Sequence, residues 1–191
     1  MLAAFQEALV SLAADAGMRR RFATDPEAAL QPFVLGVAER AALCAIPVER
    51  LERFARALVS KRWGDLARVV PLTLRVSPSL PRRYRAWALE QPATAVHGVL
   101  CPGAAEGLRA LSALHASLAN DEREARYAAD LFAFEVLGAA SRGDGEPRGL
   151  NSRFALVAIA DDVRRGLLPV DPEARATELR FERARVYWRP A

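Results

Sequence analysis

The spacing of the apolar residues changes along this 191-residue chain, and that change limits the folds that the chain can adopt. Up to about residue 140 the apolar residues recur at intervals of three and four, which is typical of one face of an α-helix. Residues 177–189 instead alternate apolar and polar side chains, which is typical of a β-strand with one buried face. Helices followed by strands predict an α+β, mainly α fold and disfavour a parallel barrel, in which strands and helices alternate.

The strongest helical pattern covers residues 47–62, where Leu51, Phe54 and Leu58 lie on one predicted face. A continuation over 63–70 after a bend at Gly64 is expected. Asp25-Pro26 predicts a helix start, because Asp is a common N-cap and Pro is favoured at the first helical position. Further helices are expected over residues 2–15, 39–46, 79–90, 104–118 and 121–140, with a loop over 91–103.

The C-terminal third predicts a small sheet. Residues 154–160 form a short apolar run that suits a strand, and residues 177–189 predict a hairpin that turns near Arg183-Ala184. The segment 141–153 contains glycine, arginine and aspartate and predicts a loop or linker. We therefore expect a helical domain over 1–140, subdivided near 62–80, and a small β-rich domain over 154–191.

Composition places the chain among globular, intracellular proteins. Hydrophobic residues make up 52% of the chain, which is enough for a core. The N-terminus has no signal-peptide pattern, and two cysteines cannot build a disulfide framework, so a cytoplasmic location is expected. No apolar run is long enough to predict a membrane span, so we expect no contact with a membrane.

The basic residues are almost all arginines, Lys61 being the one lysine, and the net charge is +4. Arginine binds phosphate and carboxylate groups through paired hydrogen bonds, so an anionic partner is one interpretation. The other is solvated helix faces with paired charges, which is favoured because no run of basic residues exceeds the three at 19–21. The pattern therefore disfavours nucleic acid as a partner.

The residues that could perform catalysis are few and dispersed. His97 falls in a predicted loop and His115 on a leucine-rich helix, so two histidines predict no metal site within the chain. Cys44 lies among apolar neighbours as a buried thiol would, and Cys101 is expected to be more exposed. The glycines at 143 and 145 do not match a phosphate-binding loop. No self-sufficient catalytic or metal site is predicted, and no cofactor.

Two surfaces are candidates for binding a partner. Carboxylates in an apolar helix are costly if buried without a partner, so they are expected either to pair with arginines of neighbouring helices or to contact another protein. On the second interpretation the predicted partner contacts are Tyr127, Asp130, Phe134 and Glu135. The predicted hairpin could accept an extended peptide by strand addition. Its candidate peptide-binding residues are Leu179, Arg180, Phe181, Glu182, Val186, Tyr187 and Trp188.

Two stretches resemble known families. The first is carried by Leu9, Leu12, Asp15, Arg19, Phe22, Asp25-Pro26-Glu27, Leu30, Leu35, Glu39 and Leu43, and it is similar to the small helical fold of extradiol-dioxygenase alpha subunits and of some peptide leaders. The second is carried by Arg83-Tyr84, Trp87 and Pro92 and by residues 127–135, Tyr-Ala-Ala-Asp-Leu-Phe-Ala-Phe-Glu. It resembles the accessory proteins of multinuclear non-heme iron-dependent oxidases, some of which are labelled as DNA-binding.

The second resemblance implies a helical body with a C-terminal sheet that binds both the iron enzyme and the leader of a ribosomally made precursor peptide. The expected function is thus a non-catalytic accessory subunit in natural-product biosynthesis, forming a heterodimer with an oxidase that holds the iron. Two alternatives remain open at this point. One is a DNA-binding transcriptional regulator, and the other is a small stand-alone enzyme that uses Asp130, Glu135, His97 or His115.

Overall fold

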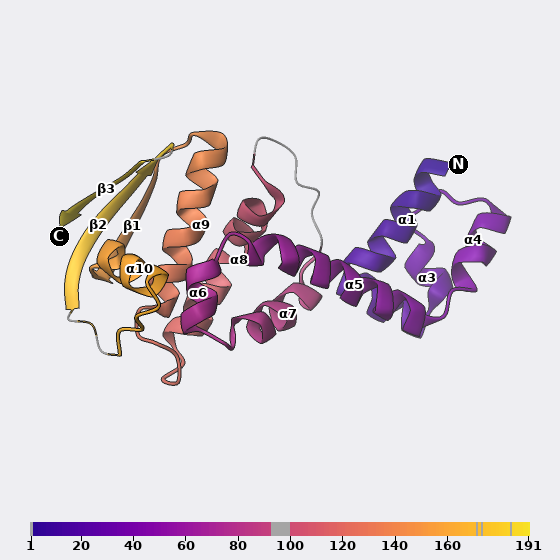
Figure 1. The fold of residues 1–191 in the computed structure, drawn as a ribbon. Helices are drawn as coiled ribbons and strands as arrows, with labels where there is room; N and C mark the ends of the chain where they lie inside the picture. The colour runs from indigo at the N-terminus through magenta and orange to yellow at the C-terminus, as the bar shows by residue number, and fades with distance from the viewer. Residues whose placement is uncertain (1, 93–99, 171, 173, 184) are drawn as a thin grey trace. The chain divides into compact units, whose positions relative to one another are not determined.

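The computed structural model describes residues 2–92, 100–170, 172, 174–183 and 185–191. In this part of the chain a mainly helical body is followed by a three-stranded antiparallel sheet, which confirms the predicted α+β class (Figure 1). The chain divides into two compact units, Met1–Lys61 with Arg85–Ala95, and Arg62–Tyr84 with Val96–Ala191. Helices α5 (Val48–Ala67) and α7 (Leu80–Glu90) contribute residues to both units.

The first unit contains short helices, and two of them, α2 and α3, start at an aspartate cap. Helix α1 (Leu2–Ala14) is followed by α2 (Ala16–Thr24), α3 (Pro26–Leu30) and α4 (Val37–Cys44). Asp15 accepts a hydrogen bond from the Met18 amide at 3.1 Å, and Asp25 accepts one from the Ala28 amide at 3.0 Å. These caps satisfy amides that have no partner inside their helices, so the prediction of a helix start at Asp25-Pro26 is confirmed.

Among the described residues, the core of the first unit is apolar except for one arginine. Arg19 is only 4% exposed, and it donates to the Ala13 carbonyl at 2.9 Å and to Glu52 at 3.3 Å. These acceptors compensate for the loss of water around the guanidinium group. The apolar side chains of this core are Ala8, Leu12, Met18, Phe22, Ala29, Leu30, Leu43 and Leu51.

The second unit holds the sheet. It contains α6 (Pro71–Val76), α8 (Pro102–Ala119), α9 (Ala128–Asp144), β1 (Arg148–Phe154), α10 (Leu156–Arg164), β2 (Ala174–Glu182) and β3 (Arg185–Pro190). The strand order is β1-β2-β3. Figure 1 shows α9 and α10 beside the sheet, and side chains of both helices share a core with Leu179 and Phe181 of β2. One face of β1 and β2 is therefore covered.

The strand register decides which side chains share that covered face. Leu179 of β2 lies opposite Leu150 of β1 and opposite Trp188 of β3, while Phe181 lies opposite Val186. Because directly opposite residues point to the same face of a sheet, Val186 and Trp188 point toward the side occupied by the helices. The predicted hairpin at 177–189 is confirmed, because β2 and β3 pair antiparallel, from Thr177 opposite Pro190 to Glu182 opposite Arg185. Ala184 of the predicted turn lies outside the described residues.

The predicted strand over 154–160 is wrong. Strand β1 ends at Phe154, and Leu156–Arg164 form α10. In α10 the residues Leu156, Ile159, Ala160 and Val163 are buried, which is a helical spacing of three and four. Most of the segment 141–153 is also regular structure, because α9 continues to Asp144 and β1 begins at Arg148. The strands share a unit with α9, so residues 154–191 do not form a compact unit of their own.

Three helix boundaries also differ from the predictions. The helix expected from 121 starts only at Ala128. In the segment before it, the Asp121 carboxylate accepts hydrogen bonds from the side chain of Arg83 and from the amide of Arg123. Helix α5 continues through Gly64 to Ala67 as one element. The predicted loop over 91–103 falls largely on residues 93–99, outside the described residues, and α8 begins at Pro102.

Candidate functional site

The outer edge of β3 is the most exposed part of the sheet. All six residues of β3 are exposed, and the exposed fraction reaches 56% for Trp188 and 48% for Tyr187. Strand β2 is central and pairs on both sides, whereas β3 pairs only with β2 among the described residues. Backbone groups along the outer edge of β3 therefore have no strand partner in this part of the chain.

The register indicates which amides of β3 point outward. In an antiparallel pair, hydrogen-bonded and non-hydrogen-bonded residue pairs alternate. Pro190 has no N–H and lies opposite Thr177, and the next amide, that of Ala191, donates to the Ala176 carbonyl at 3.1 Å. Because Ala191 is at a hydrogen-bonded position, its neighbour Pro190 is at a non-hydrogen-bonded one. Counting back from Pro190 in steps of two, Trp188 and Val186 occupy positions of the same kind. Their N–H and C=O groups are directed away from β2.

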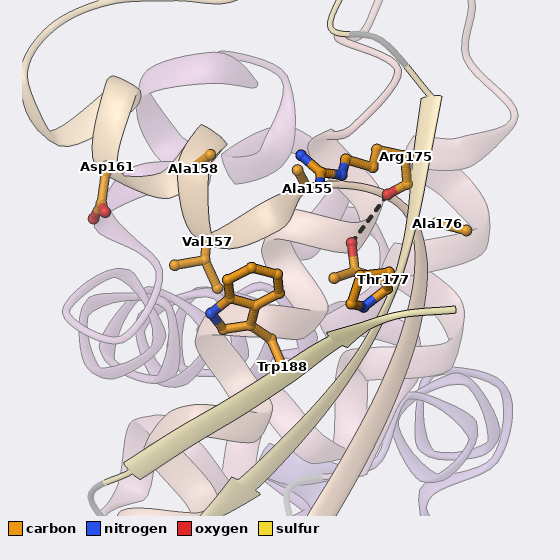
Figure 2. Close-up of a pocket in the computed structure, with 9 residues that line it drawn as sticks. Ala155, Val157, Ala158, Asp161, Arg175, Ala176, Thr177 and Trp188 are labelled. Atoms are coloured by element: carbon orange, nitrogen blue, oxygen red, sulfur yellow. Dashed lines mark hydrogen bonds between the residues drawn. The ribbon is translucent and has the colours of Figure 1, made fainter.

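A groove of about 240 Å³ lies between β3 and α10 (Figure 2). Val157 and Ala158 of α10 form one wall, and the indole of Trp188 faces them. Asp161 and Arg175 supply the charged side chains of the lining. The groove is thus mainly apolar and lies on the face toward which the side chains of Val186 and Trp188 point.

A second recess, of about 280 Å³, lies on the opposite face of the hairpin. It is lined by Glu178, Arg180, Tyr187, Trp188 and Arg189. Arg189 donates to Glu178 from Nε at 2.8 Å, and its Nη2 lies 2.6 Å from the same carboxylate oxygen. An extended chain beside β3 would place alternate side chains on the two faces, one set near the groove and the other near this recess.

The predicted peptide-binding residues separate into two groups. Leu179 and Phe181 are buried at 0% and 1% exposure, so their side chains belong to the core rather than to a binding surface. Val186, Tyr187 and Trp188 are exposed on the edge strand. The remaining two, Arg180 and Glu182, lie on β2 with their charged groups 3.9 Å apart and largely exposed.

Sequence reasoning missed the helical wall of the groove. Val157, Ala158 and Asp161 belong to α10, although the apolar run over 154–160 predicted a strand. The helical spacing of Leu156, Ile159 and Val163 is the signal that could have identified this wall. It places those three side chains on the buried side of a helix and leaves the groove residues on the other side.

Three of the four predicted partner contacts are buried within the chain, namely Tyr127, Phe134 and Glu135. Tyr127 is 1% exposed and packs edge-on against Phe154, with ring centroids 6.4 Å apart. Phe134 is 9% exposed and packs against Phe181 at 5.5 Å. Burial raises the pKa of the Tyr127 hydroxyl. Both rings stabilise the contact between α9 and the sheet.

Glu135 is 7% exposed and binds the start of α6 rather than an arginine. Its carboxylate accepts hydrogen bonds from the Leu72 amide, the Thr73 amide and the Thr73 hydroxyl, at 2.8, 2.8 and 2.7 Å. Burial raises the pKa of this carboxyl group, although the three hydrogen bonds oppose the shift. The carboxylate therefore caps a helix within the core of the second unit.

Asp130 connects two other side chains. The His115 Nε2 atom lies 3.0 Å from one Asp130 oxygen, and the Ser152 hydroxyl donates to the other at 2.6 Å. Because a carboxylate only accepts, Nε2 is the donor in this contact. The Ser152 hydroxyl has one proton, which it donates to Asp130. The arrangement therefore orients an imidazole and does not activate a serine nucleophile.

The other candidate residues do not gather with this pair. His97 lies outside the described residues. The Cys44 thiol is half-buried and lies 3.7 Å from a Glu27 oxygen, and burial, followed by that carboxylate, raises its pKa. Cys101 is exposed, as expected. Within the described part of the chain no group of three or more His, Cys, Asp or Glu side chains is placed to hold a metal ion.

Comparison with known proteins yields no relative: no protein-family model matches the chain, and no curated protein or solved structure matches it either. Among the residues that the structure describes, no helix is both long and apolar enough to cross a bilayer.

Proposed function

We propose that this chain is a non-catalytic accessory subunit that binds an extended peptide along the outer edge of β3. The observation that carries the proposal is the outward N–H and C=O groups of Val186 and Trp188, which lie beside a mainly apolar groove. Strand addition requires these two features, since main-chain hydrogen bonds give affinity and pockets for alternate side chains give specificity.

The other edge of the sheet is less suited to this role. Strand β1 begins with Arg148, which donates to both carboxylate oxygens of Asp144 at 2.7 and 2.6 Å. A charged side chain held at the start of an edge strand, together with Gly149 next to it, is typical of edges that avoid pairing. Trp188 and Val157, in contrast, supply a large apolar contact surface at the β3 edge.

The resemblance of residues 83–92 and 127–135 to accessory proteins of iron oxidases supports a specific peptide and a specific partner. The peptide is then the leader of a ribosomally made precursor, and the partner is a multinuclear non-heme iron oxidase that modifies the precursor in natural-product biosynthesis. In this proposal the iron chemistry belongs to the partner, and this chain supplies recognition.

A proline substitution tests the strand-addition step. Val186→Pro removes an N–H that faces away from β2, so the hairpin is expected to fold and to keep its circular dichroism spectrum. Loss of an intermolecular backbone hydrogen bond is expected to weaken binding of a fluorescent leader peptide about tenfold. Val186→Thr is the matched control, because it keeps the β-branched shape and the N–H. Equal affinity in the proline and threonine variants would rule out strand addition at β3.

Co-expression tests the partner. The wild-type chain and an iron oxidase encoded beside it are expected to elute together from a size-exclusion column. A chain that neither co-elutes with such an enzyme nor binds any precursor leader would not be an accessory subunit of this type.

A further inference from the structure

The second unit contains a basic recess that the peptide-binding proposal does not use. It has a volume of about 640 Å³, and apolar side chains such as Leu72 and Phe134 contribute to its lining. Its charged residues are four arginines and one glutamate, and one thiol also lines it: Arg68, Arg75, Arg142, Arg164, Glu135 and Cys101.

The four arginines come from separate parts of the chain. Arg68 follows the end of α5, and the other three lie in the last turns of α6, α9 and α10. A basic residue in a last helical turn is locally favourable because it interacts with the helix dipole. That local effect accounts for Arg75, Arg142 and Arg164 one by one, but not for the convergence of all four arginines on one recess.

Most guanidinium donors in the recess remain available. The side chain of Arg142 makes no hydrogen bond or ion pair with any residue that the structure describes. Arg75 uses one nitrogen, Nη1, which donates to the carbonyls of Val163 and Arg164 at 2.9 and 3.2 Å. Since a guanidinium group has five N–H donors in a fixed planar arrangement, several donors of Arg75 and all of those of Arg142 can bind a ligand.

Glu135, the carboxylate that lines the recess, is already hydrogen-bonded within the protein. Both oxygens of Glu135 accept hydrogen bonds from the start of α6. Arg68 and Arg164 pair with Asp65 and Asp161, neither of which lines the recess. Arg75 and Arg142 have no acidic partner among the described residues, so the lining keeps an excess of positive charge beside apolar walls. The volume of the recess is within the range of small-molecule sites.

We propose that this recess binds a small organic molecule that carries a phosphate or carboxylate group. Arginine is suited to both groups, because its planar donors match their oxygens in pairs. The apolar walls would contact the rest of the molecule. This site is separate from the β3 edge, so either proposal can fail without the other.

Cys101 offers a direct readout, because it is exposed and lines the recess. In a Cys44→Ala variant Cys101 is the one remaining thiol, and its alkylation by neutral iodoacetamide can be followed by mass spectrometry. At constant ionic strength, inorganic pyrophosphate or citrate is expected to slow the alkylation several-fold and saturably. Protection by pyrophosphate alone would assign the site to phosphates, and protection by citrate alone would assign it to carboxylates.

Two variants in the recess and one control outside it separate a built site from general charge screening. Arg142→Gln is expected to raise the concentration of anion needed for half-maximal protection about tenfold, because it removes charge-assisted hydrogen bonds. Arg68→Gln, at another exposed position on the recess, should act in the same direction. Arg53→Gln, with the same change of charge on an exposed position of α5 in the first unit, is the matched control. The proposal is overturned if neither anion protects saturably, or if the Arg142 and Arg53 variants behave alike.

Discussion

Glu135 illustrates how one residue can be identified as unusual while its partner remains unknown. A carboxylate in an apolar helix indicates a buried, satisfied group, and the structure shows such a group with three hydrogen bonds to the start of α6. Its donors lie more than sixty positions away in sequence. No local pattern connects the two segments, so an arginine or a second protein was the expected partner.

Glu135→Gln is expected to destabilise the protein by about 1–3 kcal/mol. The amide replaces one accepting oxygen with an NH2 group, which cannot accept the bonds from α6 and leaves buried donors without a partner. The free energy of unfolding in urea at pH 7 measures the effect. Glu122→Gln, at an exposed position of the same unit, is the control and is expected to change stability by less than about 0.5 kcal/mol. Equal values for the two variants would contradict the structural role of Glu135.

At the scale of elements, α5 and α8 approach each other closely at a glycine. A Cβ atom built on Gly103 would lie 2.2 Å from the Asp65 carbonyl oxygen and 2.8 Å from a Val69 methyl carbon. The nearest atom belongs to the backbone, which cannot move aside as a side chain can. Gly103 therefore allows the first turn of α8 to pack against the last part of α5.

Gly103→Ala is expected to destabilise the second unit by about 2 kcal/mol or more, because overpacking forces the two helices apart. Gly64 in α5 provides the opposite case, since a Cβ there meets no atom within 4 Å. Gly64→Ala is expected to stabilise the protein by about 0.5–1 kcal/mol through the lower backbone entropy of the unfolded chain and the better helix propensity of alanine. Thermal unfolding followed by circular dichroism distinguishes the two. A Gly103 variant as stable as the wild type would show that α5 and α8 do not pack in this way.

At the scale of the whole molecule, the charges are distributed rather than concentrated. The 27 basic residues are balanced by 23 acidic ones, and many arginines pair with acids near them, as Arg20 does with Glu90 and Arg165 with Asp162. Such pairs lower the positive potential that a nucleic-acid-binding face requires. The charge pattern thus continues to disfavour the DNA-binding alternative.

The affinity for duplex DNA tests that alternative. We expect binding of a short duplex at physiological salt to be weaker than about 1 µM and without sequence preference, as for nonspecific electrostatic contacts. Fluorescence anisotropy at several salt concentrations measures both affinity and salt dependence. Tight binding that distinguishes one duplex sequence from another would instead favour a regulator.

Sequence periodicity predicted those elements that local chemistry decides. The helix start at Asp25-Pro26, the long helix of residues 47–62 and the C-terminal hairpin follow from capping, from apolar spacing and from alternation. Short apolar runs are ambiguous between strand and helix. Residues 154–160 suit a strand by sequence, but most of them belong to helix α10. Within the candidate site, Val186, Tyr187 and Trp188 were predicted, but their neighbours on α10 were not.

Residues close together in the chain are enough to predict a mainly helical body with a terminal hairpin, because capping, apolar spacing and alternation are local. Which side chains of the hairpin are accessible depends on packing between distant segments. Leu179 is buried and Trp188 is exposed although they lie opposite each other on one face, since α9 and α10 cover β2 and leave β3 uncovered at the edge. The basic recess arose in the same way, because its arginines converge only when α6, α9 and α10 pack together.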